Sequence, residues 1–209
     1  MTDHVSKNWL ITGADKGLGA SVAEAALRQG DNVAVTVLAK DGSHPLAAEF
    51  PDTFMAIHLD AKDHGRFAEV VGKVVAKFGG IDVLHNNAGY GLIGLAEETD
   101  ESLYRPLFEV NFFAVVEMIR HVLPVMRRQR SGHILNVSSI AGFGAAPGWS
   151  FYSATKFAVE GYSEAFGRGS AASRHQSDYY RARWISQRFR WPFACKQICR
   201  PLCGLRTVC

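Results

Sequence analysis

A glycine-rich turn between a strand-like and a helix-like segment restricts the fold of this chain more than any other feature. The apolar run at 5–12, VSKNWLIT, predicts a short buried strand, and the spacing and alanine content of residues 18–29 predict a helix. The turn between them is Thr12-Gly13-Ala14-Asp15-Lys16-Gly17-Leu18-Gly19. A β-turn-α start of this kind offers backbone N–H groups and a helix N-terminus to a dinucleotide phosphate. The turn alone is weak evidence, because a structural turn also favours glycine.

Strands and helices continue to alternate up to about residue 165. Further strands are predicted at 32–38, 53–59, 81–85 and 133–137, and helices at 46–50, 67–78 and 103–126. Strands that are apolar throughout fit a parallel sheet that is buried on both faces. The alternation therefore predicts a doubly wound α/β fold.

A second motif, Tyr152-Ser153-Ala154-Thr155-Lys156, places a phenol and an ammonium group on one face of a helix. A phenol ordinarily has a pKa near 10, so acid–base work near neutrality requires a nearby cation that favours the phenolate. Ser139 follows the strand at 133–137, at the edge where open α/β sheets bind ligands. Each feature alone would be an ordinary surface pair or loop serine, but together with the glycine turn they indicate a catalytic site.

Five motifs, in this order and spacing, resemble the short-chain dehydrogenase/reductase family over residues 5–165. They are Thr12 to Gly19, Asn86-Asn87-Ala88-Gly89, Asn111 in the long helix, Ser139, and Tyr152-x-x-x-Lys156. The resemblance implies a Rossmann-type sheet. It also implies an NAD(P)-dependent oxidoreductase that transfers hydride between nicotinamide and a secondary alcohol or carbonyl substrate.

The resemblance also implies roles for individual residues. Tyr152 would exchange a proton with the substrate oxygen, Ser139 would hydrogen-bond that oxygen, and Lys156 would favour the phenolate and hold the nicotinamide ribose. Asn111 would hold a water that passes protons to Lys156. The further residues implied at the cofactor are Thr12, Gly13, Lys16, Gly17, Leu18, Gly19, Asn87, Ala88, Gly89 and, at the adenine, Asp60. A plain strand-ending turn explains Asn87 equally well.

The sequence favours NADP(H) over NAD(H). No acidic residue ends the second strand, where one would bind a free ribose 2′-hydroxyl, and Lys16 could meet a 2′-phosphate. However, NADP-preferring relatives often carry an arginine where this chain has Leu38 or Ala39, and Lys40 is the nearest cation. A solvent-facing lysine is the alternative interpretation of Lys16.

The composition changes near residue 166. Residues 1–165 contain 14 Lys and Arg against 19 Asp and Glu and no cysteine, whereas residues 166–209 contain 9 against 1 and all four cysteines. We therefore predict a dinucleotide-binding domain at 1–165 and an atypical basic tail at 166–209, disordered or non-native. The family's sixth and seventh strands and its Pro-Gly turn are not recognisable there. The sheet is thus expected to be truncated after the fifth strand and the Tyr-Lys helix.

The tail has the pattern of a frame-shifted translation. Reading each codon from its second nucleotide, from Arg174 onward, permits G-I-K-V-T-I-I-E-P-G-G-F, which supplies the missing strand and Pro-Gly turn. The nucleotide sequence of the gene decides this hypothesis, and an in-frame continuation supported by independent reads would reject it. Without those strands we expect a poorly stable chain with little or no activity.

An alternative is a catalytically inactive NADP(H)-binding module whose basic, aromatic tail binds nucleic acid or an anionic surface. Cys195, Cys199 and Cys203 are spaced unlike common zinc sites, and the histidines show no paired ligand spacing, so no metal is expected. The preferred hypothesis has a small-molecule carbonyl or alcohol substrate, no nucleic-acid or membrane partner and a cytoplasmic location. The resemblance further implies a homo-oligomer that pairs through the long helix and the Tyr-Lys helix.

Overall fold

The computed structural model describes residues 5–172 and 180–185, with side chains described up to Gly167. These residues form a parallel sheet in the order β3-β2-β1-β4-β5-β6. The strands are β1 Asn8–Ile11, β2 Asn32–Val37, β3 Phe54–His58, β4 Val83–Asn86, β5 Gly132–Val137 and β6 Tyr180–Ile185. The strand order changes direction between β1 and β4, which is where doubly wound sheets open a crevice for ligands at their carboxyl edge.

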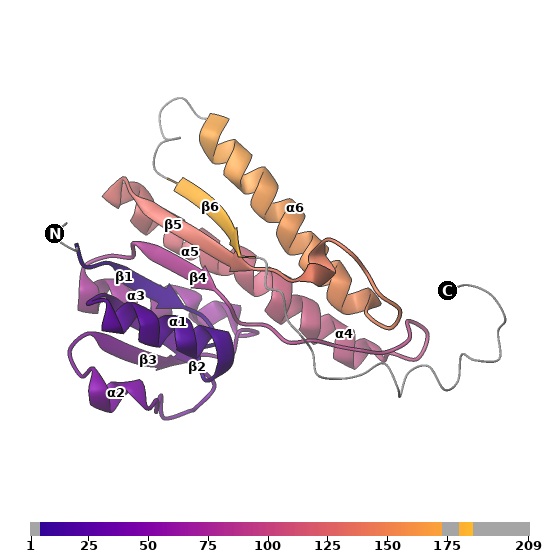
Figure 1. Ribbon diagram of the computed structural model, residues 1–209, viewed down its shortest axis with the longest axis horizontal. Helices are drawn as coiled ribbons and strands as arrows, with labels where there is room; N and C mark the ends of the chain where they lie inside the picture. Colours follow the sequence, from indigo (N-terminus) through magenta and orange to yellow (C-terminus); the bar gives the residue numbers. More distant parts are fainter. Residues whose placement is uncertain (1–4, 173–179, 186–209) are drawn as a thin grey trace.

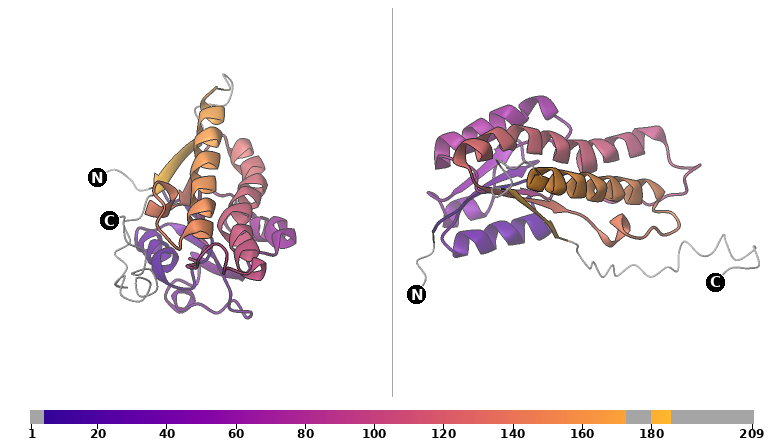
Figure 2. Two further views of the ribbon diagram at one scale, coloured as in Figure 1. Left: turned by 90° about the vertical axis from the view of Figure 1, so that its right-hand side faces the viewer. Right: turned by 90° about the horizontal axis from the view of Figure 1, so that it is seen from above.

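Helices cover the sheet from both sides (Figures 1 and 2). The helices are α1 Gly17–Arg28, α2 Leu46–Glu49, η1 His64–Arg66, α3 Phe67–Phe78, α4 Glu101–Phe108, η2 Glu109–Phe113, α5 Ala114–Gln129, η3 Ile140–Gly142 and α6 Ser150–Ala172. One buried cluster joins α1 and α2 to β1, β2 and β3, and a larger one joins α3 and α5 to the opposite face of the sheet. This arrangement confirms the doubly wound α/β fold.

The structure adds one strand to the sheet that the sequence predicts. β6 pairs with β5 in parallel from Gly132↔Tyr180 to Val137↔Ile185, so β5 is not an open edge. The segment YRARWI alternates between arginine and uncharged residues over its first five positions, a short period-2 pattern typical of a strand. Helix α6 also continues to Ala172, past the expected boundary at residue 165. The rest of the predicted tail, 173–179 and 186–209, lies outside the described residues.

The long helix predicted at 103–126 is one helical run that changes its winding. α4 passes into α5 through a single π-helical turn, η2, with Asn111 at its centre. Pro106 lies just upstream and lacks the N–H group that an α-helix would bond to the carbonyl of Ser102. π-Helical turns are rare and often occur at functional sites.

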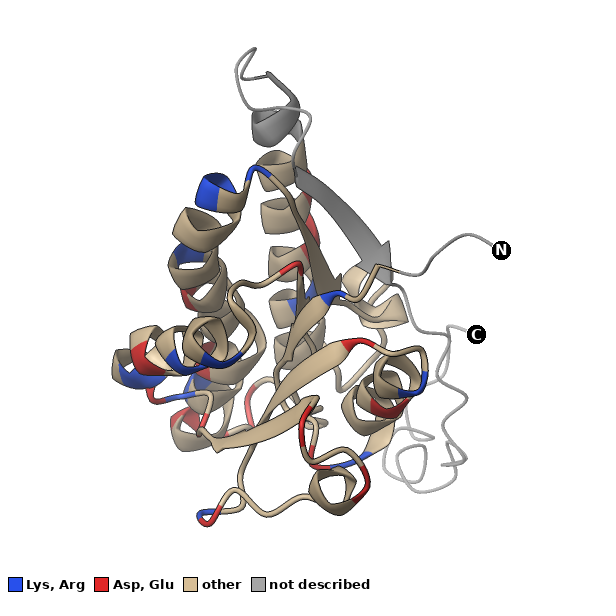
Figure 3. Cartoon of the chain, turned by 90° about the vertical axis from the view of Figure 1, so that its left-hand side faces the viewer, with Lys and Arg blue, Asp and Glu red and all other residues tan. Residues whose placement is uncertain are grey.

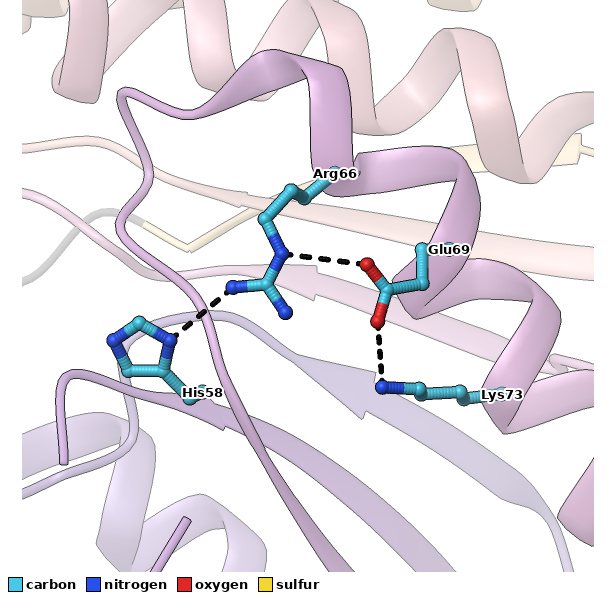
Figure 4. A network of polar contacts seen from close by, with 4 residues as sticks. All are labelled: His58, Arg66, Glu69 and Lys73. Atoms are coloured by element: carbon cyan, nitrogen blue, oxygen red, sulfur yellow. Dashed lines mark hydrogen bonds and ion pairs between the residues drawn. The ribbon is translucent and has the colours of Figure 1, made fainter. Parts of the chain in front are cut away.

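Acidic and basic residues are interspersed along the helices of the described part of the chain (Figure 3). One exposed network joins β3 to α3: Arg66 contacts the His58 ring nitrogen at 3.2 Å and Glu69 at 3.3 Å, and Glu69 pairs with Lys73 at 2.6 Å (Figure 4). Mutually exposed pairs of this kind each contribute at most about 1 kcal/mol. Among the helices of residues 5–172, none combines the length and the apolar character needed to cross a bilayer.

Candidate active site

The glycine turn after β1 is packed tightly against the turn after β4. Gly13 has φ +65°, and a Cβ on it would lie 2.7 Å from the Cα of Ala88. A Cβ on Gly19 would lie 2.5 Å from Asn87 Nδ2. Glycine is therefore required at both positions, at Gly13 also because of its left-handed backbone.

Asn87 and Thr12 bind these two turns together. The Asn87 amide donates to the carbonyls of Thr12 at 3.0 Å and Gly13 at 2.7 Å. In return, the Thr12 hydroxyl accepts from the backbone N–H groups of Asn87 and Ala88 at 3.0 and 3.1 Å. The reciprocal contacts fix the carboxyl ends of β1 and β4 side by side.

The N-terminus of α1 fits the phosphates of a dinucleotide. Its N-cap, Lys16, makes no side-chain cap, and its first turn contains no acidic residue. Gly17 has φ +65° and open space where a Cβ would project. The helix therefore presents free N–H groups and the positive end of its dipole, and no Cβ blocks the approach. These are the features that favour binding of an anion. Leu18 follows, half-buried.

Asn111 anchors the loop that follows β4. Its side chain is buried, its Oδ1 accepts from the Tyr90 N–H at 3.0 Å, and its Nδ2 donates to the Tyr90 carbonyl at 2.9 Å. Nδ2 also lies 3.2 Å from the Thr155 hydroxyl of α6. The π-helical turn thus places one amide between the β4 loop and the helix that carries Tyr152 and Lys156.

Lys156 lies beneath Tyr152 on the buried face of α6. Its Nζ donates to the Val137 carbonyl at the end of β5 at 2.9 Å and lies 5.9 Å from the centroid of the Tyr152 ring. A Cβ on Gly89 would lie 3.7 Å from Nζ, an ordinary contact distance, so the Gly89 turn passes close to the ammonium. Burial lowers the pKa of Lys156 to about 8, and the negative charge of Glu160 opposes this shift. The cation is therefore held close to the phenol at physiological pH.

Ser139 stands at the carboxyl end of β5 and caps η3. Its hydroxyl accepts from the Ala141 N–H at 3.2 Å, and its backbone is extended. η3 packs against α6, the helix that carries Tyr152. The structure brings Ser139 to the same edge of the sheet as Asn87, Gly89 and Lys156, and its hydroxyl proton remains available to a further acceptor.

Two predicted cofactor residues lie apart from this group. Asp60, which follows β3, accepts from the Lys62 N–H at 2.9 Å and pairs with the Lys62 ammonium at 3.4 Å. Lys16 is exposed. Their roles at the adenine and at a 2′-phosphate therefore remain predictions.

Several residues that support the site were not found from the sequence. The Thr36 hydroxyl accepts from the Gly13 N–H at 3.0 Å, and the His44 Nε2 lies 3.1 Å from the Ala14 carbonyl. Tyr90 and Val137 contribute only backbone groups, which no side-chain motif indicates. The position of Thr155 within the Tyr-Lys motif was its only signal.

Comparison with known proteins agrees with this geometry. The family model for the short chain dehydrogenase matches residues 7–174. Oxidoreductase BOA17 of Botryotinia fuckeliana is 39% identical over 160 residues, which are 76% of this chain and 58% of that protein. The 3-ketodihydrosphingosine reductase of Bacteroides thetaiotaomicron is 39% identical over 156 residues, 75% of this chain and 55% of that protein.

A short-chain dehydrogenase of Streptomyces avermitilis has a similar solved structure, with a TM-score of 0.81, 38% identity and coverage of 88% of this chain and 66% of that one. The sheet and its covering helices define a doubly wound α/β protein of the Rossmann type. The chain belongs to the short chain dehydrogenase family, and it spans a little over half the length of the two curated relatives named above. Among the described residues, no three His, Cys, Asp or Glu side chains are grouped so that they could hold a metal ion.

Proposed function

We propose that this chain carries the site of an NAD(P)-dependent oxidoreductase that interconverts a secondary alcohol and a carbonyl compound. The observation that carries the proposal is the placement of Lys156. Its ammonium is buried, bonded to the Val137 carbonyl, and close to both Tyr152 and the Gly89 turn. A buried cation costs free energy that pairing and hydrogen bonds offset only in part, and here the cation lies beside a phenol that can exchange a proton.

The bound nicotinamide would supply or accept the hydride. Gly13, Gly17 and Gly19 would hold the phosphates at the start of α1. Tyr152 would give a proton to the carbonyl oxygen in reduction, or remove it from the hydroxyl in oxidation, and Ser139 would hydrogen-bond the same oxygen. The charge on Lys156 stabilises the phenolate that Tyr152 becomes when it donates its proton.

Asn111 would complete the proton path. Both ends of its amide are occupied by Tyr90, so it cannot turn away from α6. We propose that it holds a water which returns protons to Lys156. The reductase name of the Bacteroides relative supports carbonyl reduction as the direction to test first.

The proposed cofactor preference is NADP(H). The support is the exposed Lys16 at the N-cap of α1 and the absence of an acidic residue at the end of β2, which is followed by Leu38. Fluorescence titration of the purified 209-residue chain with NADPH and NADH tests this preference. Tighter binding of NADPH, lost in Lys16→Ala, is expected, whereas equal affinities would reject it.

Hydride transfer is a separate question for this chain. Its relatives are longer, and residues 186–209 do not resemble the family's substrate loop. We therefore expect cofactor binding with little or no turnover of simple ketones, measured as loss of nicotinamide absorbance. Efficient NADPH-dependent reduction by the purified chain would contradict this expectation.

The composition of residues 166–209 favours a second candidate, an inactive NADP(H)-binding module with a nucleic-acid-binding tail. Phosphate binding by Lys and Arg weakens steeply as salt increases. A salt-dependent affinity for DNA or RNA that disappears when residues 173–209 are removed would support this candidate. No such affinity at low salt would reject it.

A homo-oligomer is also proposed. Phe113 at the end of η2 and Phe157 on α6 are 44% and 47% exposed, and they lie on the two helices through which the family resemblance implies pairing. Light scattering of the purified chain is expected to show a dimer or a tetramer, and a monomer would contradict it.

A further inference from the structure

Glu160 is a buried acid that the proposed mechanism does not use. It lies on α6 one turn after Lys156 and is 7% exposed. Neither of its carboxylate oxygens has a hydrogen-bond partner in the structure. A buried carboxylate without a partner is costly, so its presence on the inner face of this helix requires an explanation.

The surroundings of Glu160 are polar and enclosed. A Cβ on Gly142 of η3 would lie 2.7 Å from the Ser138 hydroxyl, 3.0 Å from Glu160 Cγ and 3.1 Å from the Lys156 carbonyl. Ser138 is itself buried, and its hydroxyl also lacks a partner. Gly142 therefore lets the Ser138 hydroxyl, the Glu160 side chain and the backbone carbonyl of Lys156 pack closely together where a larger residue would not fit.

We infer that Glu160 is a positioning residue for Lys156: from the next turn of the buried helix face, its carboxylate holds the charge on the Lys156 ammonium. Side chains four residues apart are neighbours on a helix. Lys156 Nζ lies at the Val137 carbonyl and the Glu160 side chain lies near the hydroxyl of the next residue, Ser138, so both side chains reach the same end of β5. The inference deepens the proposed function and rests on it, because only there does the charge on Lys156 have a task.

The electrostatics of the pair agree with the geometry. Burial lowers the pKa of Lys156, and Glu160 is the group that opposes it. Burial likewise raises the pKa of Glu160, and the Ser138 hydroxyl and Lys156 oppose that shift. Each charge is thus unfavourable alone and favourable beside the other, as expected for a pair in a region of low polarity.

The other titratable groups on the neighbouring elements are not carboxylates placed beside Lys156. Tyr152 on α6 and Tyr90 after β4 are phenols, and Glu109 of η2 lies 3.8 Å from His64. In β6, Arg181 and Arg183 are in register with His133 and Leu135. His133 and Leu135 alternate along β5 with Asn136, whose side-chain amide donates a hydrogen bond to the Ser163 hydroxyl of α6. Within the part of the chain whose side chains are described, Glu160 is the acid next to Lys156 on this helix face.

Competitive acylation of the full-length chain tests the inference without any need for activity. Acetic anhydride modifies only neutral amines, so peptide mass spectrometry over a pH series gives the apparent pKa of each lysine. In Glu160→Gln we expect the acylation rate of Lys156 at pH 7 to rise at least about 2.5-fold, because lowering a pKa of about 8 by half a unit increases the neutral fraction at pH 7 by that factor. Glu160→Asp should restore most of the original rate.

Two controls make the result specific. Glu164→Gln removes the same charge from α6 one turn further on and should leave Lys156 unchanged. The rate at exposed Lys73 should be the same in all variants, which shows that the fold is intact. An unchanged Lys156 rate in Glu160→Gln would overturn the inference, since it would mean that Glu160 is protonated and only packs. Failure to bind NADPH would instead reject the proposed function, whatever the labelling shows.

Discussion

Lys156 Nζ donates to the carbonyl of Val137 at 2.9 Å, which connects the helix of the Tyr-Lys motif to the last residue of β5. The contact crosses from α6 to the carboxyl edge of the sheet, where Ser139 follows two residues later. It fixes the direction of the ammonium group and therefore the distance between the cation and the Tyr152 ring. The geometry of the proposed acid–base group thus depends on a backbone carbonyl that no motif contains.

The burial of Lys156 predicts a stability cost that depends on pH. Its pKa is about 8 in the folded chain against 10.5 in an exposed lysine, so between these values the unfolded state binds more protons and stability increases with pH. The full cost, about 3 kcal/mol, is present below pH 8 and is lost by about pH 10.5. Urea unfolding from pH 7 to 10.5 should show this increase in the unmodified chain and not in Lys156→Met. Lys73→Met, at an exposed lysine, should retain it.

His85 predicts a loss of stability in acid. It is fully buried in β4, both ring nitrogens lack partners, and burial lowers its pKa to about 4. Because the unfolded histidine takes up a proton near pH 6.5, stability falls as pH decreases from 6.5 to 4, by about 2 kcal/mol at pH 5. His85→Leu should remove this part of the pH dependence, and His133→Leu, at an exposed position, should not. Parallel unfolding curves for His85→Leu and the unmodified chain would contradict the assignment.

Asn111 is expected to matter for both folding and cofactor binding. Asn111→Ala leaves the Tyr90 N–H and carbonyl without their buried partner, which costs about 1–3 kcal/mol. Because the loop after Gly89 is then released, NADPH affinity should fall as well. Thr155→Val removes only one contact of the same amide and should have the smaller effect on both. Equal urea midpoints for Asn111→Ala and the unmodified chain would show that Tyr90 is held by other groups.

Substitutions at two glycines of the first turn and at one helix glycine should separate the cost of backbone strain from the cost of steric obstruction. Gly17→Ala is expected to cost about 1 kcal/mol because of its positive φ, and to weaken NADPH binding because its methyl group enters the phosphate site. Gly19→Ala should cost more, since its Cβ meets Asn87 Nδ2. Gly72→Ala in α3 meets nothing and should stabilise the chain by about 0.5–1 kcal/mol. Thermal unfolding and NADPH titration measure both effects.

The sequence by itself was sufficient for the class of fold and for the residue types at the site. Periodicity predicted the first five strands and the covering helices, because burial on one or two faces imposes a repeat that any reader of the chain can find. The glycine turn and the Tyr-Lys pair could also be found from the sequence, because a tight turn and one turn of helix each involve only neighbouring residues. Residues 180–185 were missed because a pattern that alternates over only five residues of an unusual tail gives little signal.

Only the tertiary structure decided which of these groups meet. The clamp between Thr12 and Asn87, the π-helical turn that presents Asn111 to Tyr90, and the carbonyl of Val137 under Lys156 all join residues 19 to 75 positions apart. The position of the buried Glu160 side chain beside Ser138 likewise depends on residues that are far apart in the sequence. Such contacts depend on the order of strands in the sheet and on backbone atoms that every residue shares, and neither leaves a mark in the local sequence.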